Sequence, residues 1–123
     1  MKTQSVYISS LRKEVTYYIG NSAEDNFATI DRMESREDLW FHAGSGISSC
    51  HVVCVLADMA PLDKKARRQI ITQGAILCKQ HTAKLRCLPN VIIQYAPLYL
   101  VTKTDVAGKV IIHETARIKT VAV

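Results

Sequence analysis

Long hydrophobic runs are absent from this chain of 123 residues. No stretch approaches the ~18 consecutive apolar residues that a membrane-spanning helix needs, so we expect no membrane insertion. The N-terminal segment 1–18 also lacks a secretory hydrophobic region and an Arg-rich amphipathic transit pattern. These absences favour a cytoplasmic protein whose cysteines are reduced thiols, each buried in the core. The cysteines are Cys50, Cys54, Cys78 and Cys87.

Acidic residues are missing from one long segment of the chain and concentrated in another. Seven Lys or Arg and no acid lie between Lys64 and Arg86, whereas seven acids and only two Arg lie between Glu14 and Asp38. The net charge is +5. Such segregation predicts a polarised surface whose positive side attracts polyanions, either nucleic acid or an acidic membrane surface.

Apolar residues make up 48% of the chain, which is enough for a single core at this length. Helices are too few to cross over between every pair of strands, so we expect a single α+β domain with a largely antiparallel sheet. One long basic helix and one short helix accompany the sheet. The expected strands span 4–8, 15–19, 39–43, 51–56, 91–94, 98–103, 109–113 and 117–121, and the helices span 22–33 and 61–83.

The long expected helix has two distinct faces. Its apolar side is formed by Ala66, Ile70, Ile71, Gly74, Leu77 and Cys78. Its cations, with two more in the following loop, are Lys64, Lys65, Arg68, Lys79, Lys84 and Arg86. A charged helix face is usually only solvated, but this excess without an intervening acid favours contact with phosphates.

A polar triplet alternates along the strand expected at 39–43. Period two places Asp38, Trp40 and His42 on one side of the sheet, with the core on the other side. An indole can stack on a base, a carboxylate can accept from a base edge, and an imidazole can contact a base or a phosphate. The alternative is that Trp40 is half-buried and that Asp38 or His42 satisfies nearby backbone groups.

His51 opens the next strand and would lie near His42 if the two strands pair. This neighbourhood suggests two catalytic or metal alternatives. One is a zinc site from His42, His51, Cys50 and Cys54, but C-x-x-C and H-x-x-x-H spacings are absent. The other is a nucleophilic set of Cys50, a histidine and Asp38, which lacks any nucleophile motif. We therefore expect no cofactor, no metal and no catalysis.

Several short segments follow one another in an order that carries a family resemblance. They are Tyr18-Ile19-Gly20, Ala23-Glu24-Asp25-Asn26, Asp38-Leu39-Trp40-Phe41-His42, Gly44 to Gly46, His51-Val52-Val53, Val101-Thr102-Lys103 and Gly108-Lys109-Val110. With these segments the chain resembles the NFACT-R domain, the RNA-binding module of proteins in ribosome-associated quality control. The likeness covers most of the chain from about Tyr17 onward.

The sequence departs from the family pattern at one loop. The family's usual Pro-Gly-Ser before the second histidine is Ser48-Ser49-Cys50 here, so the glycine that would allow close backbone approach to a ligand is missing. The large N-terminal portion and the coiled coil that accompany this module elsewhere are not in this sequence. The resemblance therefore implies RNA binding without peptide tailing.

Three classes of function follow from these observations. The first is a non-catalytic module that binds tRNA or rRNA in translation or ribosome-associated quality control. The second is a module that binds DNA or docks on a protein or on the ribosome. The third is a metal-dependent phosphoesterase or nuclease, for which the sequence carries no signature.

Overall fold

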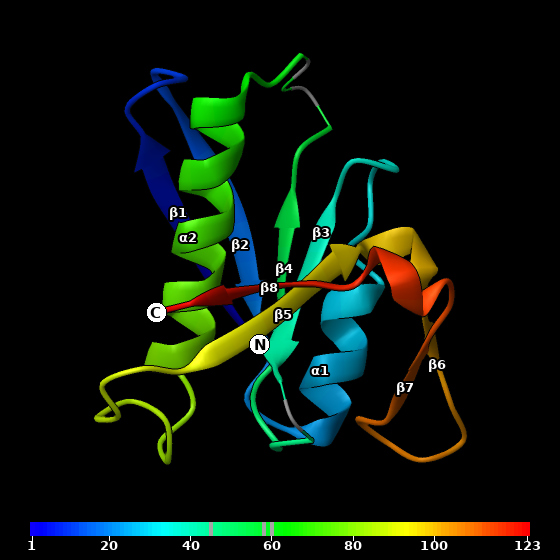
Figure 1. Cartoon of the computed structure of the whole chain (residues 1–123). Coiled ribbons are helices and arrows are strands. Elements are labelled where there is room, and N and C mark those ends of the chain that lie inside the picture. The colour runs from blue at the N-terminus through cyan, green and yellow to red at the C-terminus, as the bar shows by residue number, and fades with distance from the viewer. Residues whose placement is uncertain (45, 58, 60) are drawn as a thin grey trace.

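A computed structural model describes residues 1–44, 46–57, 59 and 61–123 (Figure 1). In chain order its elements are β1 (Lys2–Ile8), β2 (Lys13–Ile19), α1 (Ala23–Ile30), β3 (Leu39–Ala43), β4 (Val52–Val55), α2 (Lys64–Gln80), β5 (Ile92–Pro97), η1 (Leu98–Leu100), β6 (Val101–Lys103), β7 (Val110–Ile112), η2 (Thr115–Arg117) and β8 (Lys119–Ala122). The α+β class is therefore confirmed.

One six-stranded sheet organises the domain. Its strand order is β1-β2-β4-β3-β5-β8, and every neighbouring pair is antiparallel. A separate hairpin is formed by β6 and β7. The strands expected at 4–8 and 15–19 form the β1–β2 hairpin, and β3 pairs with β4, which is the condition under which His51 would lie near His42. Among the described residues, no helix combines the length and the apolarity needed to cross a membrane.

The long helix α2 covers one face of the sheet and closes the main core (Figure 1). It is capped by Asp63, whose carboxylate accepts from the backbone N–H of Ala66. Ile70 and Cys78 pack from α2 against Leu39, Phe41 and other buried strand residues. The expected apolar side of the helix and the expected core side of β3 are thus the same interface.

The opposite face of the sheet is covered by α1 and the β6–β7 hairpin. Trp40 and Val53 from the sheet pack there with Val101, Val110 and other residues of these two elements. The short helix α1 is capped by Ser22, whose hydroxyl accepts from the backbone N–H of Asp25. The second face is therefore largely core as well.

The strand expected at 98–103 is only partly formed. The chain leaves the main sheet after Pro97. Leu98–Leu100 then form a 3₁₀ turn, and the backbone N–H of Leu98 donates to the carbonyl of Asp38. Only Val101–Lys103 is extended, and it pairs with β7 outside the main sheet. This turn buries Leu98 and Leu100, a packing gain that alternation along the strand does not reveal.

Gly74 is the point of closest approach between α2 and the sheet. A Cβ atom built on Gly74 would overlap the ring of Phe41. The helix can lie this close to β3 only because position 74 has no side chain.

We expect Gly74→Ala to destabilise the domain. Overpacking costs about 1–3 kcal/mol, whereas the gain in helix propensity is only about 1 kcal/mol. Urea unfolding followed by circular dichroism measures the difference, with Lys65→Ala on the exposed side of α2 as the control. A Gly74→Ala variant as stable as the wild type would contradict this packing.

Candidate nucleic-acid interface

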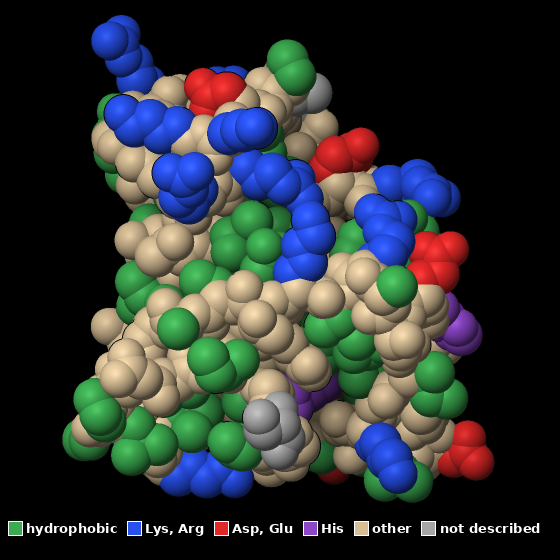
Figure 2. Space-filling model, viewed as in Figure 1, with side chains coloured by type: hydrophobic (Ala, Val, Ile, Leu, Met, Phe, Trp, Pro, Cys, Tyr) green, Lys and Arg blue, Asp and Glu red, His purple; other side chains and the backbone are tan. Residues whose placement is uncertain are grey.

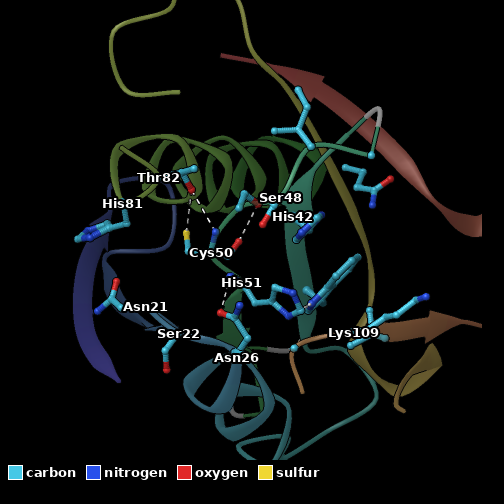
Figure 3. Close-up of a pocket in the computed structure, with 18 of the residues that line it drawn as sticks. Asn21, Ser22, Asn26, His42, Ser48, Cys50, His51, His81, Thr82 and Lys109 are labelled. Carbon is cyan, nitrogen blue, oxygen red and sulfur yellow. Dashed lines mark hydrogen bonds between the residues drawn. The ribbon is translucent and has the colours of Figure 1, made fainter. Parts of the chain in front are cut away.

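A cleft of about 900 Å³ opens at the end of the sheet where α2 finishes (Figure 3). Its walls come from the connection between β3 and β4, the segment after α2, the start of α1, strand β5 and the turn before β7. Segments that are distant in the sequence therefore meet around one hollow. The loop residue Ser45 lies outside the described residues.

Three rings form the floor of the cleft. The Trp40 and His42 rings stack nearly parallel, with centroids 5.6 Å apart and an interplanar angle of 3°. The His51 ring stands edge-on to both, with centroids 5.4 Å from Trp40 and 5.0 Å from His42. The expected proximity of His42 and His51 is thus confirmed.

Hydrogen bonds define which nitrogen of each histidine carries the proton. The indole Nε1–H of Trp40 donates to Nδ1 of His51 at 3.2 Å, so a neutral His51 carries its proton on Nε2. Nδ1 of His42 lies 2.8 Å from the carbonyl oxygen of Ala43, which can only accept. A neutral His42 therefore presents Nε2 as an acceptor.

Both histidines are held in the neutral form. Burial, with the nearby charge of His42 as a smaller cause, lowers the pKa of His51 to about 3. Burial also lowers the pKa of His42, a shift that the hydrogen bond to Ala43 opposes and the charge of Lys84 increases. The rings therefore act as neutral hydrogen-bonding and stacking groups near neutral pH.

Trp40 is not an open stacking platform, contrary to the sequence expectation. Its side of the sheet is covered by the β6–β7 hairpin and α1, which leaves the residue 1% exposed. His42 is half-buried and lines the cleft, so it is the accessible ring of the stack.

Asp38 has a structural role instead of the expected contact with a base. It is fully buried, and its carboxylate accepts from the backbone N–H groups of Glu34, Ser35 and Leu56 and from the hydroxyl of Ser35. These bonds fix the chain at the entrance of β3. The carboxylate has no accessible oxygen to offer a ligand.

Asn26 ties α1 to the strand that carries His51. Its side-chain Oδ1 accepts from the backbone N–H of His51 at 3.0 Å. Gly20 passes directly beside it, because a Cβ atom at position 20 would overlap the Asn26 side chain. These two residues of the family-like segments therefore hold one wall of the cleft against its floor.

The loop Ser48-Ser49-Cys50, whose sequence differs from the family pattern, is anchored to β3 and to the C-terminal end of α2. The hydroxyl of Ser49 accepts from the N–H of Ala43 at 2.9 Å and donates to the carbonyl of Cys50. The N–H of Cys50 donates to the hydroxyl of Thr82 at 3.1 Å. Ser49, which stands in place of the family's glycine, thus serves as an anchor, and exposed Ser48 lines the cleft.

The two catalytic or metal arrangements do not form. Cys50 and Cys54 belong to the core on the α2 side, whereas His42 and His51 lie with Trp40 on the other side of the sheet. Asp38 lies at the opposite end of β3 from Cys50, since Leu39 pairs with Cys54 and Phe41 with Val52. Within the described ranges no cluster of three or more metal-ligating side chains occurs.

The cysteines follow the burial expectation except at one position. Cys50, Cys54 and Cys78 are buried, but Cys87 is exposed in the loop after α2. Cys50 and Cys78 face each other, and each Sγ donates to the other's carbonyl, at 3.4 and 3.5 Å. The hydrogen bond with Cys50, together with burial, raises the pKa of the Cys78 thiol.

The predicted cations divide into two groups. Lys64, Lys65 and Arg68 are exposed in the first turns of α2, over which Lys and Arg side chains gather in Figure 2. Lys84 lines the cleft beyond the other end of α2. A helix of 17 residues is about 25 Å long. One short ligand therefore cannot contact both groups.

The remaining two predicted cations, Lys79 and Arg86, differ from these groups and from each other in their surroundings. Lys79 is half-buried, and its Nζ donates to the backbone carbonyl of Val123 at 3.1 Å, so its ammonium already has a partner within the chain. Arg86 is exposed in the loop after α2. Burial lowers the pKa of His81, which lines the cleft, and the charges of Lys2 and Arg86 are smaller causes in the same direction.

Several cleft residues were not predicted from the sequence. They are Asn21, Ser22, Ser48, Gln94 and Lys109. Lys109 carried the clearest signal, because it lies in the family-like Gly-Lys-Val segment. Its neighbour Gly108 has a φ of +78° and abuts Ala23, so the turn lies against the start of α1. None of the described lining residues is acidic.

No family model and no curated protein matches this chain. Among solved structures, a chain described as the C-terminal part of the fibronectin/fibrinogen-binding protein of Streptococcus suis has the same fold. The TM-score is 0.73 at 22% sequence identity, and the alignment covers 100% of this chain and 45% of that chain. This domain therefore corresponds to less than half of that structure.

We expect the stability of the domain to fall between pH 7.5 and pH 5. The unfolded chain binds a proton at His51 near pH 6.5, whereas the folded state does not until about pH 3, so acid favours unfolding. His51 alone lowers the free energy of unfolding by about 2 kcal/mol between pH 7.5 and pH 5. Urea unfolding at several pH values measures it.

The matched variants for the pH series are His51→Gln and His113→Gln. A glutamine oxygen can still accept from the indole of Trp40, but the side chain does not titrate, so the pH dependence should become shallower. His113 is exposed and does not line the cleft, so His113→Gln serves as the control substitution. Identical slopes for the His51→Gln variant and the wild type would contradict the assignment.

Proposed function

We propose that this chain is a non-catalytic RNA-binding domain whose principal contact with RNA is the cleft. One observation carries the proposal. The cleft combines Lys84 and Lys109 with uncharged hydrogen-bonding side chains, and none of its described lining residues is acidic. A concave surface with cations and neutral donors, but without carboxylates in the described lining, suits a polyanion that also has hydrogen-bonding bases.

The family-like segments support RNA as the polyanion. Asn26, Trp40, His42, His51 and the Gly108-Lys109-Val110 segment come from distant parts of the sequence, yet all of them line this cleft. The resemblance to the NFACT-R domain implies an RNA partner, either tRNA or rRNA. We propose that this RNA binds in the cleft and that the domain acts in translation or ribosome-associated quality control.

The cations of α2 would add a second, weaker contact. Lys64, Lys65 and Arg68 are exposed about one helix length from the cleft. A folded RNA such as tRNA is large enough to reach both places. These residues would then contribute affinity through counterion release and no base recognition.

A protein partner is the competing function. The structural neighbour is named as a fibronectin/fibrinogen-binding protein, and this domain aligns with 45% of the solved C-terminal chain. Docking on a ribosomal protein belongs to the same class, and DNA is the alternative nucleic acid. Each of these gives a distinct outcome in a binding test.

We expect tRNA to bind the wild-type chain with an affinity that falls steeply with salt. Replacing Lys84 and Lys109 together by Gln should weaken binding about tenfold and reduce the salt slope by about 1 to 2, because two phosphate contacts are lost. Lys119→Gln is the control, since Lys119 pairs with Tyr95 and projects from the α2 side of the sheet. Fluorescence anisotropy over a salt series measures both quantities.

Competition experiments separate the alternatives. Unlabelled tRNA, rRNA fragments, duplex DNA and single-stranded DNA are compared against the same labelled tRNA. Equal competition by DNA would assign the cleft to nucleic acids in general. No tRNA or rRNA binding at low salt, together with retention of fibronectin or ribosomal proteins, would overturn the proposal in favour of protein docking.

A further inference from the structure

The dimensions of the cleft limit what can enter it. A hollow of about 900 Å³ is in the range of small-ligand sites, roughly 300–1,000 Å³. A base inside a double helix is hidden in the stack, and the deep major groove of A-form RNA is closed to side chains. The interior of the cleft can therefore be reached by nucleotides that are not paired.

His42 is suited to receive the face of a base. It is the accessible member of a two-ring stack whose inner member, Trp40, is buried. Trp40 is fixed by its hydrogen bond to His51, and His42 is fixed by its hydrogen bond to Ala43. A base placed on His42 would extend a stack that is already ordered, so little conformational entropy is lost on binding.

Gln94 is suited to read the edge of that base. It is the direct cross-strand partner of His42 in the β3–β5 pair, and it lines the same cleft. Directly opposed residues in antiparallel strands have Cβ atoms only about 5 Å apart. A carboxamide offers both a donor and an acceptor, so Gln94 can pair with either kind of group on the base edge.

Cations lie on two separate walls around this floor. Lys84 comes from the segment after α2. Lys109, labelled in Figure 3, comes from the turn before β7. A nucleotide within a strand has a phosphate on each side of its sugar, so two cations on different walls fit one unpaired nucleotide with its neighbours.

From this arrangement we infer that the cleft takes an unpaired nucleotide of an RNA loop or single-stranded end. Its base stacks on His42 and its edge meets Gln94, while the flanking phosphates meet Lys84 and Lys109. This inference rests on the proposed RNA-binding function. It assigns base contact to His42 and Gln94 and leaves only phosphate contact to the α2 cations.

The test compares a single-stranded RNA tetranucleotide, a blunt RNA duplex without unpaired nucleotides, and tRNA. The tetranucleotide should shift the NMR signals of the His42 imidazole and the Trp40 indole N–H, whereas the duplex should leave them in place. His42→Ala should weaken tetranucleotide binding about tenfold through lost stacking. His42→Phe keeps an aromatic platform and should retain most of the affinity.

Two further variants separate recognition of the base edge from electrostatic attraction of the phosphates. Gln94→Ala should reduce the difference in affinity among tetranucleotides of A, C, G and U. The triple variant Lys64→Glu, Lys65→Glu and Arg68→Glu should weaken tRNA binding and leave tetranucleotide binding unchanged. Circular dichroism spectra and thermal unfolding identify any variant that fails to fold.

The outcomes distinguish the inference from the function on which it rests. If tRNA binds but the duplex competes as well as the tetranucleotide, and folded His42→Ala binds like the wild type, the unpaired-nucleotide inference is wrong while RNA binding stands. If none of the three RNAs binds, the proposed function itself fails.

Discussion

The hydrogen bond from the indole of Trp40 to the imidazole of His51 is the interaction on which the cleft depends. It joins the side chains of β3 and β4, selects the tautomer of His51, and fixes the ring on which His42 stacks. The backbone of His51 is held in turn by Asn26 of α1, so strand β3 and the covering helix α1 both bind at one residue. With His51 protonated, Nδ1 could no longer accept the indole proton, so the neutral imidazole is a condition for the arrangement.

The family-like residues divide into those that build the cleft and those that can meet a ligand. Asp38, Asn26 and Gly20 belong to the first group, because their polar atoms or close contacts are used within the chain. His42 and Lys109 belong to the second, since they line the hollow and are at least partly accessible. Residues of these segments therefore build the fold of the cleft as well as its accessible surface.

The sequence predicted the sheet face of each β3 residue correctly, because alternation is a local property of a strand. It also predicted that His51 would lie near His42, which required only that two adjacent strands pair. It could not predict that Trp40 is covered, since the cover comes from the β6–β7 hairpin some sixty residues later in the chain. The role of the Asp38 carboxylate was misassigned for a similar reason. One of its partners, the backbone N–H of Leu56, comes after β4 and is therefore distant from Asp38 in the sequence.

The basic helix α2 shows another limit on what helical spacing can predict. Helical spacing groups Lys64, Lys65 and Arg68, but spacing does not say how far a group is from a site formed by other elements. The partner of Lys79 is likewise a backbone carbonyl more than forty residues away. Gln94 was missed because a single polar residue in an otherwise apolar strand carries no signal until its cross-strand partner is known.

Photocrosslinking of the intact domain to tRNA, followed by mass spectrometry of the RNA-linked peptides, is the most direct test of the cleft as the RNA site. Crosslinks should fall on peptides that contain His42, Lys84, Gln94 or Lys109, which the chain brings together only in its folded form. Crosslinks confined to the first turns of α2 or to the largely exposed strand β1, with none in the cleft, would contradict the account.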